Sequence, residues 1–198
     1  MGCREKTSRK IGERRYNKLF LIATEGTKTE KQYFEGLGLK VDGKQVHIKH
    51  LKKKESKNSP EKLINLMKDE LKKHNITERD EAWIITDKDS WTDEQLNKIV
   101  TWSQLKEYYG FALSNPKFEY WLLLHFEEGN NVISSNSCSD KLRRYLRDYD
   151  KSIDMGKIDE SMIRLAIIRA SSKDVPPCKK WPISNGSTVY RLVEKIMI

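Results

Sequence analysis

Short apolar segments alternate with longer amphipathic ones along the first part of the chain. Four segments have the apolar or alternating pattern of β-strands, at residues 19–24, 44–51, 82–86 and 110–114. Helices are predicted between them, over residues 29–37 and from Pro60 and Thr92 onward. This strand–helix alternation is typical of an α/β fold in which a parallel sheet is covered by helices.

The pattern changes after residue 127, where no segment predicts a strand. Helical spacing of apolar residues instead predicts helices over 141–149, 160–170 and 188–196. We therefore expect a flexible basic arm at residues 1–16 and a single domain at 17–198. Within this domain, residues 17–127 form the predicted α/β core and residues 128–198 a mainly helical extension.

Composition adds a preference for polyanionic partners. Apolar residues make up 37% of the chain and charged residues 34%, and the net charge is +9. Residues 1–18 alone contribute +5 of that charge. Two interpretations of this arm remain open, a tail that contacts phosphates and a tail that only aids solubility.

The sequence also indicates a cytoplasmic protein with no membrane contact. The N-terminus lacks the apolar run of a signal peptide, and the longest apolar runs are far shorter than the ~20 residues that span a bilayer. Cys3, Cys138 and Cys178 are widely spaced, which disfavours a disulfide framework or a zinc site.

Acidic residues follow the ends of the predicted strands. Glu25 follows the first strand, Asp87 and Asp89 the third, and Glu119 lies just beyond the fourth. Because parallel strands end at the same edge of a sheet, we expect these carboxylates to converge there. Such a group repels itself unless a cation neutralises it, and oxygen ligands alone favour Mg²⁺ or Mn²⁺.

Several of these residues also have a structural interpretation. Glu25 alone could be a solvated turn residue, and Asp87 and Asp89 could cap the helix that follows them. Glu30 fits a capping box with Thr27, so we expect it to close a helix rather than to act in chemistry. His125 is expected to be a hydrogen-bonded core residue.

The segment NPKFEYWLLLHF (115–126) predicts a helix with a firm start. Asn115 suits the N-cap and Pro116 the first helical position. The helical neighbours of Glu119 are then apolar, which favours a functional role for this carboxylate.

Three blocks together resemble the RloB-like family, a branch of the Toprim superfamily. They are LIATEGTKTEKQYFEGL (21–37), WIITDKDS (83–90) and NPKFEYWLLLHF (115–126), with a weaker similarity in NGSTVYRLVEKI (185–196). The resemblance covers roughly residues 17–196. Lys117 departs from the pattern, where an apolar or small residue is more typical, and this bears on local packing.

The resemblance implies a Toprim fold, a small, mainly parallel, Rossmann-like sheet of about four strands between helices. It implies acid–base or metal-binding roles for Glu25 and Mg²⁺ binding by Asp87 and Asp89. The family is associated with anti-phage defence loci, which implies a toxic nuclease and a protein partner encoded in the same locus.

The functional hypothesis is metal-dependent hydrolysis of phosphodiester bonds in RNA or DNA. Glu25, Asp87, Asp89 and Glu119 are the candidate catalytic residues and metal ligands. Candidate phosphate contacts are Gly26, Lys28, Asn115, Lys173, Lys179 and Lys180. Two alternatives remain, a non-catalytic nucleic-acid-binding or sensor subunit and a housekeeping Toprim ribonuclease that matures RNA. The sequence does not choose between RNA and DNA, and it leaves the oligomeric state and the activation trigger open.

Overall fold

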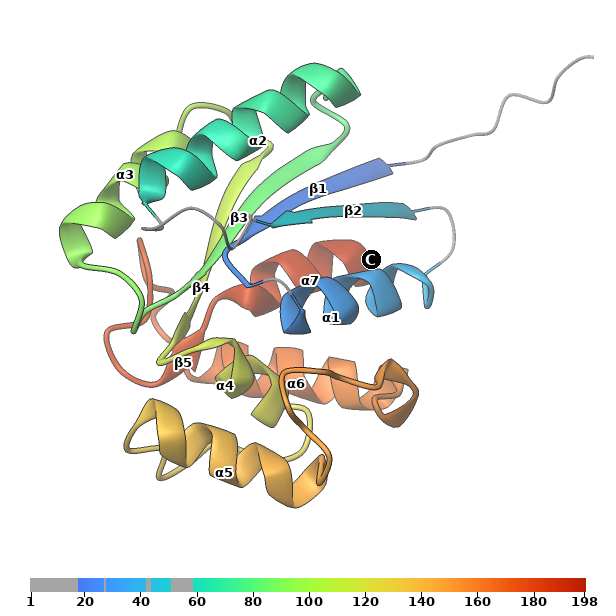
Figure 1. Cartoon of the computed structure of the whole chain (residues 1–198), viewed down its shortest axis with the longest axis vertical. Helices are drawn as coiled ribbons and strands as arrows, with labels where there is room; N and C mark the ends of the chain where they lie inside the picture. Colours follow the sequence, from blue (N-terminus) through green and yellow to red (C-terminus); the bar gives the residue numbers. More distant parts are fainter. Residues whose placement is uncertain (1–17, 27, 42–43, 51–58) are drawn as a thin grey trace, which may run out of the picture.

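Four parallel strands form the centre of the fold, and the expected α/β class is confirmed (Figure 1). The strands are β1 Lys18–Thr24, β2 Lys44–His50, β3 Glu81–Asp87 and β4 Tyr109–Asn115. Across the sheet they lie in the order β2-β1-β3-β4, and the two-residue β5, Gly186–Ser187, is antiparallel to β4. This computed structural model describes residues 18–26, 28–41, 44–50 and 59–198, so the predicted arm at 1–16 lies outside the described residues.

Strands β1, β3 and β4 are apolar on both faces because helices cover both sides of the sheet. In β1, Phe20 and Ile22 belong to one hydrophobic cluster, whereas Leu21 and Ala23 belong to the other. A strand buried on both faces reads as a continuous apolar run, which is how the sequence revealed β1 and β3.

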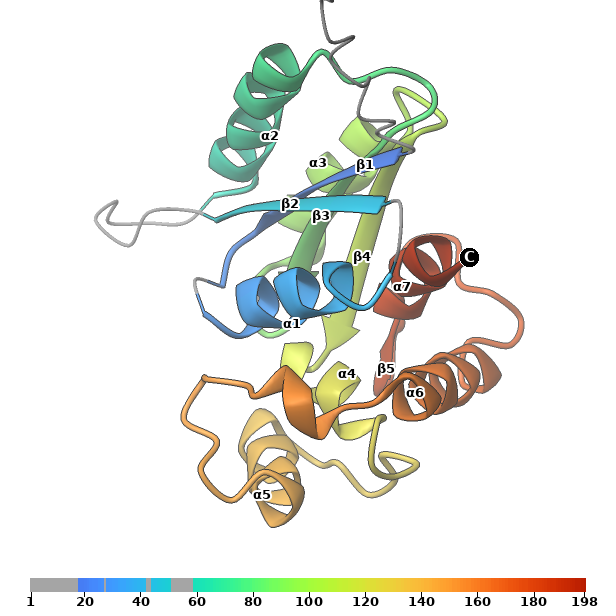
Figure 2. The ribbon, with the colours of Figure 1, turned by 90° about the vertical axis from the view of Figure 1, so that its right-hand side faces the viewer.

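The helices divide into two layers. They are α1 Thr29–Gly38, α2 Pro60–His74, α3 Asp93–Ser103, α4 Phe118–Leu123, α5 Ser135–Tyr145, α6 Glu160–Ser172 and α7 Val189–Met197, with a short 3₁₀ helix η1 at Met155–Lys157. Helices α2 and α3 cover one face, and α1 and α7 cover the other (Figure 2). Beyond α1 and α7 lie α4, α5 and α6, and one hydrophobic cluster joins all of these to the sheet.

Helix starts follow their capping residues. Ser59 accepts the backbone N–H of Lys62 at the start of α2, and Thr92 forms the expected capping box with Gln95. The prediction of a helix over 141–149 was wrong in position, because α5 begins at Ser135. Ser134 is the N-cap of α5. The first turn of this helix is rich in serine and lacks the apolar spacing that predicts a helix.

The start of α4 also differs from the prediction. Asn115 is not an N-cap and Pro116 is not helical: the peptide between them is cis, and α4 begins at Phe118 after Lys117. Asn115 instead ends β4, and its side-chain amide donates to the carbonyl oxygens of Pro182 and Ile183 at 3.1 and 3.0 Å. The amide thereby anchors the loop before β5.

Strand β5 is the element that the sequence did not predict. Only Gly186 and Ser187 pair with β4, where the hydroxyls of Ser187 and Ser114 lie 2.8 Å apart. Two residues carry no periodicity to detect.

Among the described residues, no helix has the length and apolar character needed to cross a membrane.

Gly110 permits the close packing of β4 against β3. A Cβ at this position would lie 2.3–2.5 Å from atoms of the Trp83 ring, which is fixed in the core. We expect Gly110→Ala to lower the free energy of unfolding by about 1–3 kcal/mol through overpacking. Urea denaturation measures this loss. Gly156→Ala, at an exposed position in η1, is the control and should change stability by less than about 0.5 kcal/mol.

Candidate active site

The strand order places a topological switch point between β1 and β3. The chain leaves β1 toward β2 on one side, whereas β3 and β4 lie on the other. In open α/β sheets this is the position where ligands bind, beyond the carboxyl ends of the strands. Glu25 follows β1 and Asp87 ends β3, so the first two predicted site residues flank this point.

Asp87 is a half-buried carboxylate at this edge. Burial raises its pKa well above the ordinary range, and the carboxylates of Glu30, Glu119, Asp89 and Glu25 raise it further, in that order. The backbone N–H of Phe118, at the start of α4, donates to its Oδ1 at 2.8 Å. The structure thus brings all four predicted carboxylates together and adds a fifth, Glu30. We refer to these five residues as the carboxylate cluster.

Glu30 is the site residue that the sequence interpretation missed. The N-cap of α1 is Lys28, one residue later than the capping box predicts, and its side chain makes no cap hydrogen bond; Thr27, the predicted capping partner, lies outside the described residues. Glu30 is buried, and its burial together with the charges of Glu119 and Glu25 raises its pKa to about 7. A signal did exist, since Glu30 shares its helix face with the buried residues Tyr33, Phe34 and Leu37.

Gly26 lies directly against the Glu30 carboxylate. A Cβ on Gly26 would meet both carboxylate oxygens at 2.0 Å. The side chain of Thr24 donates to the Gly26 carbonyl at 2.8 Å and holds the turn in place. The absence of a side chain at Gly26 is therefore needed for the packing of Glu30 against this turn.

Two further members of the carboxylate cluster are held by hydrogen bonds from outside it. The indole N–H of Trp91 donates to Oε2 of Glu25 at 2.8 Å, and this ring is itself buried. The hydroxyl of Ser135, at the start of α5, donates to Oδ2 of Asp89. Both donors hold the side chains of residues that follow a strand and would otherwise have their carboxylates in solvent.

Glu119 is held by a tyrosine from a distant part of the chain. The hydroxyl of Tyr149 donates to Oε1 of Glu119 at 3.0 Å and lies 3.2 Å from the Thr29 hydroxyl. Burial and the Glu119 charge raise the Tyr149 pKa, so this hydroxyl remains a proton donor. Nothing in the sequence near Tyr149 pointed to this contact, because it spans 30 residues.

The donor set fits a hard divalent cation. No group of three or more His, Cys, Asp or Glu side chains is arranged as a ready-made metal site in the described part of the chain. Mg²⁺, however, commonly uses only one or two protein carboxylates and completes its shell with water and substrate phosphate. The repulsion that raises the Asp87 pKa is what a bound cation would relieve.

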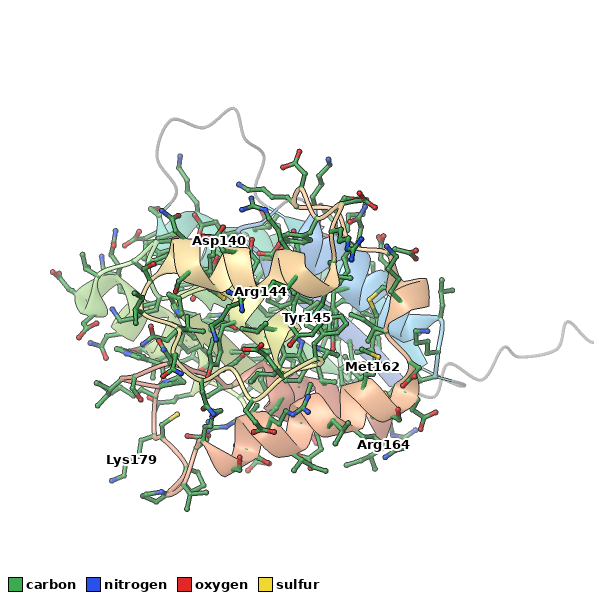
Figure 3. The ribbon with its side chains drawn as sticks, turned by 90° about the horizontal axis from the view of Figure 1, so that it is seen from below. Asp140, Arg144, Tyr145, Met162, Arg164 and Lys179 are labelled. Atoms are coloured by element: carbon green, nitrogen blue, oxygen red, sulfur yellow. The ribbon has the colours of Figure 1, made fainter. Side chains whose placement is uncertain are left out.

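Of the predicted phosphate contacts, Gly26 lies against Glu30 of the carboxylate cluster, whereas Lys173 and Lys180 have their hydrogen-bond partners outside it. Lys173 donates to Asn130 at 3.2 Å and Lys180 to Asn97 at 2.6 Å, so their observed partners are neutral side chains outside it. Figure 3 shows Lys179 well separated from Asp140 on α5. Lys28 is exposed beside α1.

His125 is a core residue, as expected. It is buried, with Nε2 3.1 Å from the Tyr33 hydroxyl and Nδ1 3.1 Å from the Trp121 carbonyl oxygen. Burial lowers its pKa to about 4, so the ring is neutral at physiological pH. It packs beneath the cluster and is not part of it.

The arrangement of strand ends and acids agrees with a match to a known family. A family profile described as RloB-like protein matches residues 20–196, which is most of the chain. The chain belongs to the RloB-like family. Neither the curated proteins nor the solved structures contain a match to it. The three blocks that suggested this membership surround the carboxylate cluster in the fold.

The raised pKa of Glu30 predicts that the free energy of unfolding depends on pH. The folded state holds the Glu30 proton more tightly than the unfolded chain, so this stabilisation is full below pH 4.5 and is lost as pH rises through about 7. Because Gln cannot ionise, Glu30→Gln should match wild type near pH 4.5 and exceed its unfolding free energy by up to about 3 kcal/mol above pH 7. Denaturation across this pH range in metal-free buffer measures the difference.

Asp69→Asn is the matched control for Glu30→Gln. Asp69 is exposed on α2, far along the chain from the carboxylate cluster. Its difference from wild type should not vary over the same pH range. A Glu30→Gln difference that is equally flat would contradict the buried, like-charged environment described for Glu30.

Proposed function

We propose that this RloB-like protein is a Mg²⁺- or Mn²⁺-dependent nuclease of the Toprim type, acting as a toxic effector in anti-phage defence. One observation carries the proposal. Carboxylates that follow β1 and β3 or lie on α1 and α4 act on the half-buried Asp87 at the switch point of a parallel sheet. Such a group is costly without a cation, and a cation there suits phosphodiester hydrolysis. The defence role rests on family membership alone.

The proposed roles follow from position and contacts. Asp87 and Asp89 would hold the metal, with Glu119 and Glu25 as further ligands. A metal bound there would stabilise the negative charge that develops on the phosphate oxygens. Glu25, oriented by the Trp91 indole, accepts the proton of the attacking water. The P–O bond to the leaving oxygen breaks, and this oxygen takes a proton from solvent.

The secondary contacts have supporting roles. Tyr149 keeps Glu119 directed toward the carboxylate cluster through its hydroxyl. Glu30, with its pKa near 7, holds a proton for part of the time at neutral pH and so reduces repulsion when no metal is bound. Glu30 is therefore a positioning residue in this proposal.

The proposal predicts loss of cleavage from two separate substitutions. Glu25→Gln removes the proton acceptor and Asp87→Asn a metal ligand, so each should reduce cleavage by about 10²–10⁴-fold. Purified protein incubated with labelled tRNA, bulk RNA, single-stranded DNA and duplex DNA measures this, with Mg²⁺, Mn²⁺ or chelator. Asp69→Asn should cut like wild type.

Two outcomes would reject this mechanism. If Glu25→Gln and Asp87→Asn cut as fast as wild type, the assignment of the site is wrong. If the protein binds nucleic acid but cuts none of these substrates with either metal, the sensor alternative takes the place of the nuclease.

Mg²⁺ should also raise the thermal midpoint of the wild type more than that of Asp87→Asn.

A further inference from the structure

A polar cavity of about 390 Å³ lies beside the carboxylate cluster. Glu119 and Tyr149 form part of its wall, so the cavity and the carboxylate cluster share the Glu119 side chain. Helix α5 forms another part of the wall, and Figure 3 shows Asp140 on this helix from below. Its volume is near the lower end of the ~300–1,000 Å³ of small-molecule pockets.

Three cations line this cavity, each from a different element. Lys117 precedes α4, Arg143 lies on α5, and Lys151 lies in the connection after α5. The Lys117 ammonium donates to the Ser139 hydroxyl at 2.7 Å, which ties it to the α5 side of the cavity. This contact agrees with the local effect expected for Lys117 from the sequence.

The remaining lining gives the cavity both signs of charge. Two acids, Asp140 and Asp150, also line the cavity, and Asp140 accepts a hydrogen bond from the Arg143 guanidinium at 3.1 Å. Cations suit a phosphate, whereas carboxylates and the Asn136 amide suit sugar hydroxyls and base amino groups. A ligand with an anionic end and several hydrogen-bond donors, such as a nucleotide, matches this mixture.

We propose that the cavity is a subsite for one nucleotide of a single-stranded nucleic acid, adjacent to the phosphodiester that the carboxylate cluster cleaves. This inference rests on the proposed nuclease function. A cavity of this volume accepts a single nucleotide but not a base-paired duplex. Single strands can turn one nucleotide out of the stack without first breaking a base pair, so the geometry favours them as substrates.

The cations of the subsite are tested by neutral substitutions in α5 and before α4. Arg143→Gln and Lys117→Gln each remove one phosphate contact, and Arg144→Gln is the matched control. Arg144, labelled in Figure 3, is exposed on the same helix but does not line the cavity. All three variants change the net charge equally, so a general electrostatic effect would not separate them.

Binding is measured separately from cleavage. Fluorescence anisotropy with short single-stranded RNA, single-stranded DNA and duplex DNA, in Ca²⁺ and with each oligonucleotide checked to be intact, gives the affinities. Arg143→Gln and Lys117→Gln should bind single strands about five- to tenfold more weakly, with a salt slope reduced by about one. Arg144→Gln should bind like wild type, and wild type should prefer single strands to duplex.

The outcomes separate this subsite from the proposed activity. Equal binding by all three variants, equal weakening of all three, or a preference for duplex would overturn the subsite even if metal-dependent cleavage is found. Selective weakening without any cleavage would support the subsite and reject the nuclease. Failure of the wild type to bind any nucleic acid would reject both. Thermal midpoints close to wild type show that the variants are folded.

Discussion

Mutual repulsion among buried carboxylates is the constraint on which the rest of this structure depends. Asp87 is half-buried, and four neighbouring acids oppose its ionisation. Only a rigid frame holds such a group together, and the frame here includes large fully buried side chains such as Tyr33, Phe118 and Trp121. Ring contacts join Tyr33 to Phe118 and to Trp121 directly beneath the edge. Stability supplied by this core offsets the repulsion at the site.

Much of the fold was predictable because it depends on local pattern. Strands β1 and β3 are continuous apolar runs, and the rule that parallel strands end at one edge was enough to group Glu25, Asp87 and Asp89. Glu30 was misassigned because a capping pattern and a buried helix face overlap at the start of α1. Asn115 was misassigned because N-cap chemistry and a strand-end anchor use the same side chain. The contact between Tyr149 and Glu119 could not be predicted from the sequence, since it exists only in the folded chain.

Charge is distributed unevenly around the carboxylate cluster. The chain as a whole carries +9, yet the residues beyond the carboxyl ends of β1 and β3 are acidic. Three cations, Lys117, Arg143 and Lys151, lie around the adjoining cavity. A polyanion can therefore be attracted to the molecule by its general charge and positioned by the cavity, while the acids remain available for a metal.

The hydrogen bond from Tyr149 to Glu119 joins two parts of the chain that the sequence pattern separates. Tyr149 lies in the helical region beyond residue 127, whereas Glu119 belongs to the part that contains the sheet. The carboxylate cluster is thus a composite, and the sheet alone does not contain it. Insertions or exchanges between α5 and η1 would alter the orientation of Glu119 without touching any strand. Sequence changes in this connection can therefore shift one member of the cluster while the sheet stays the same.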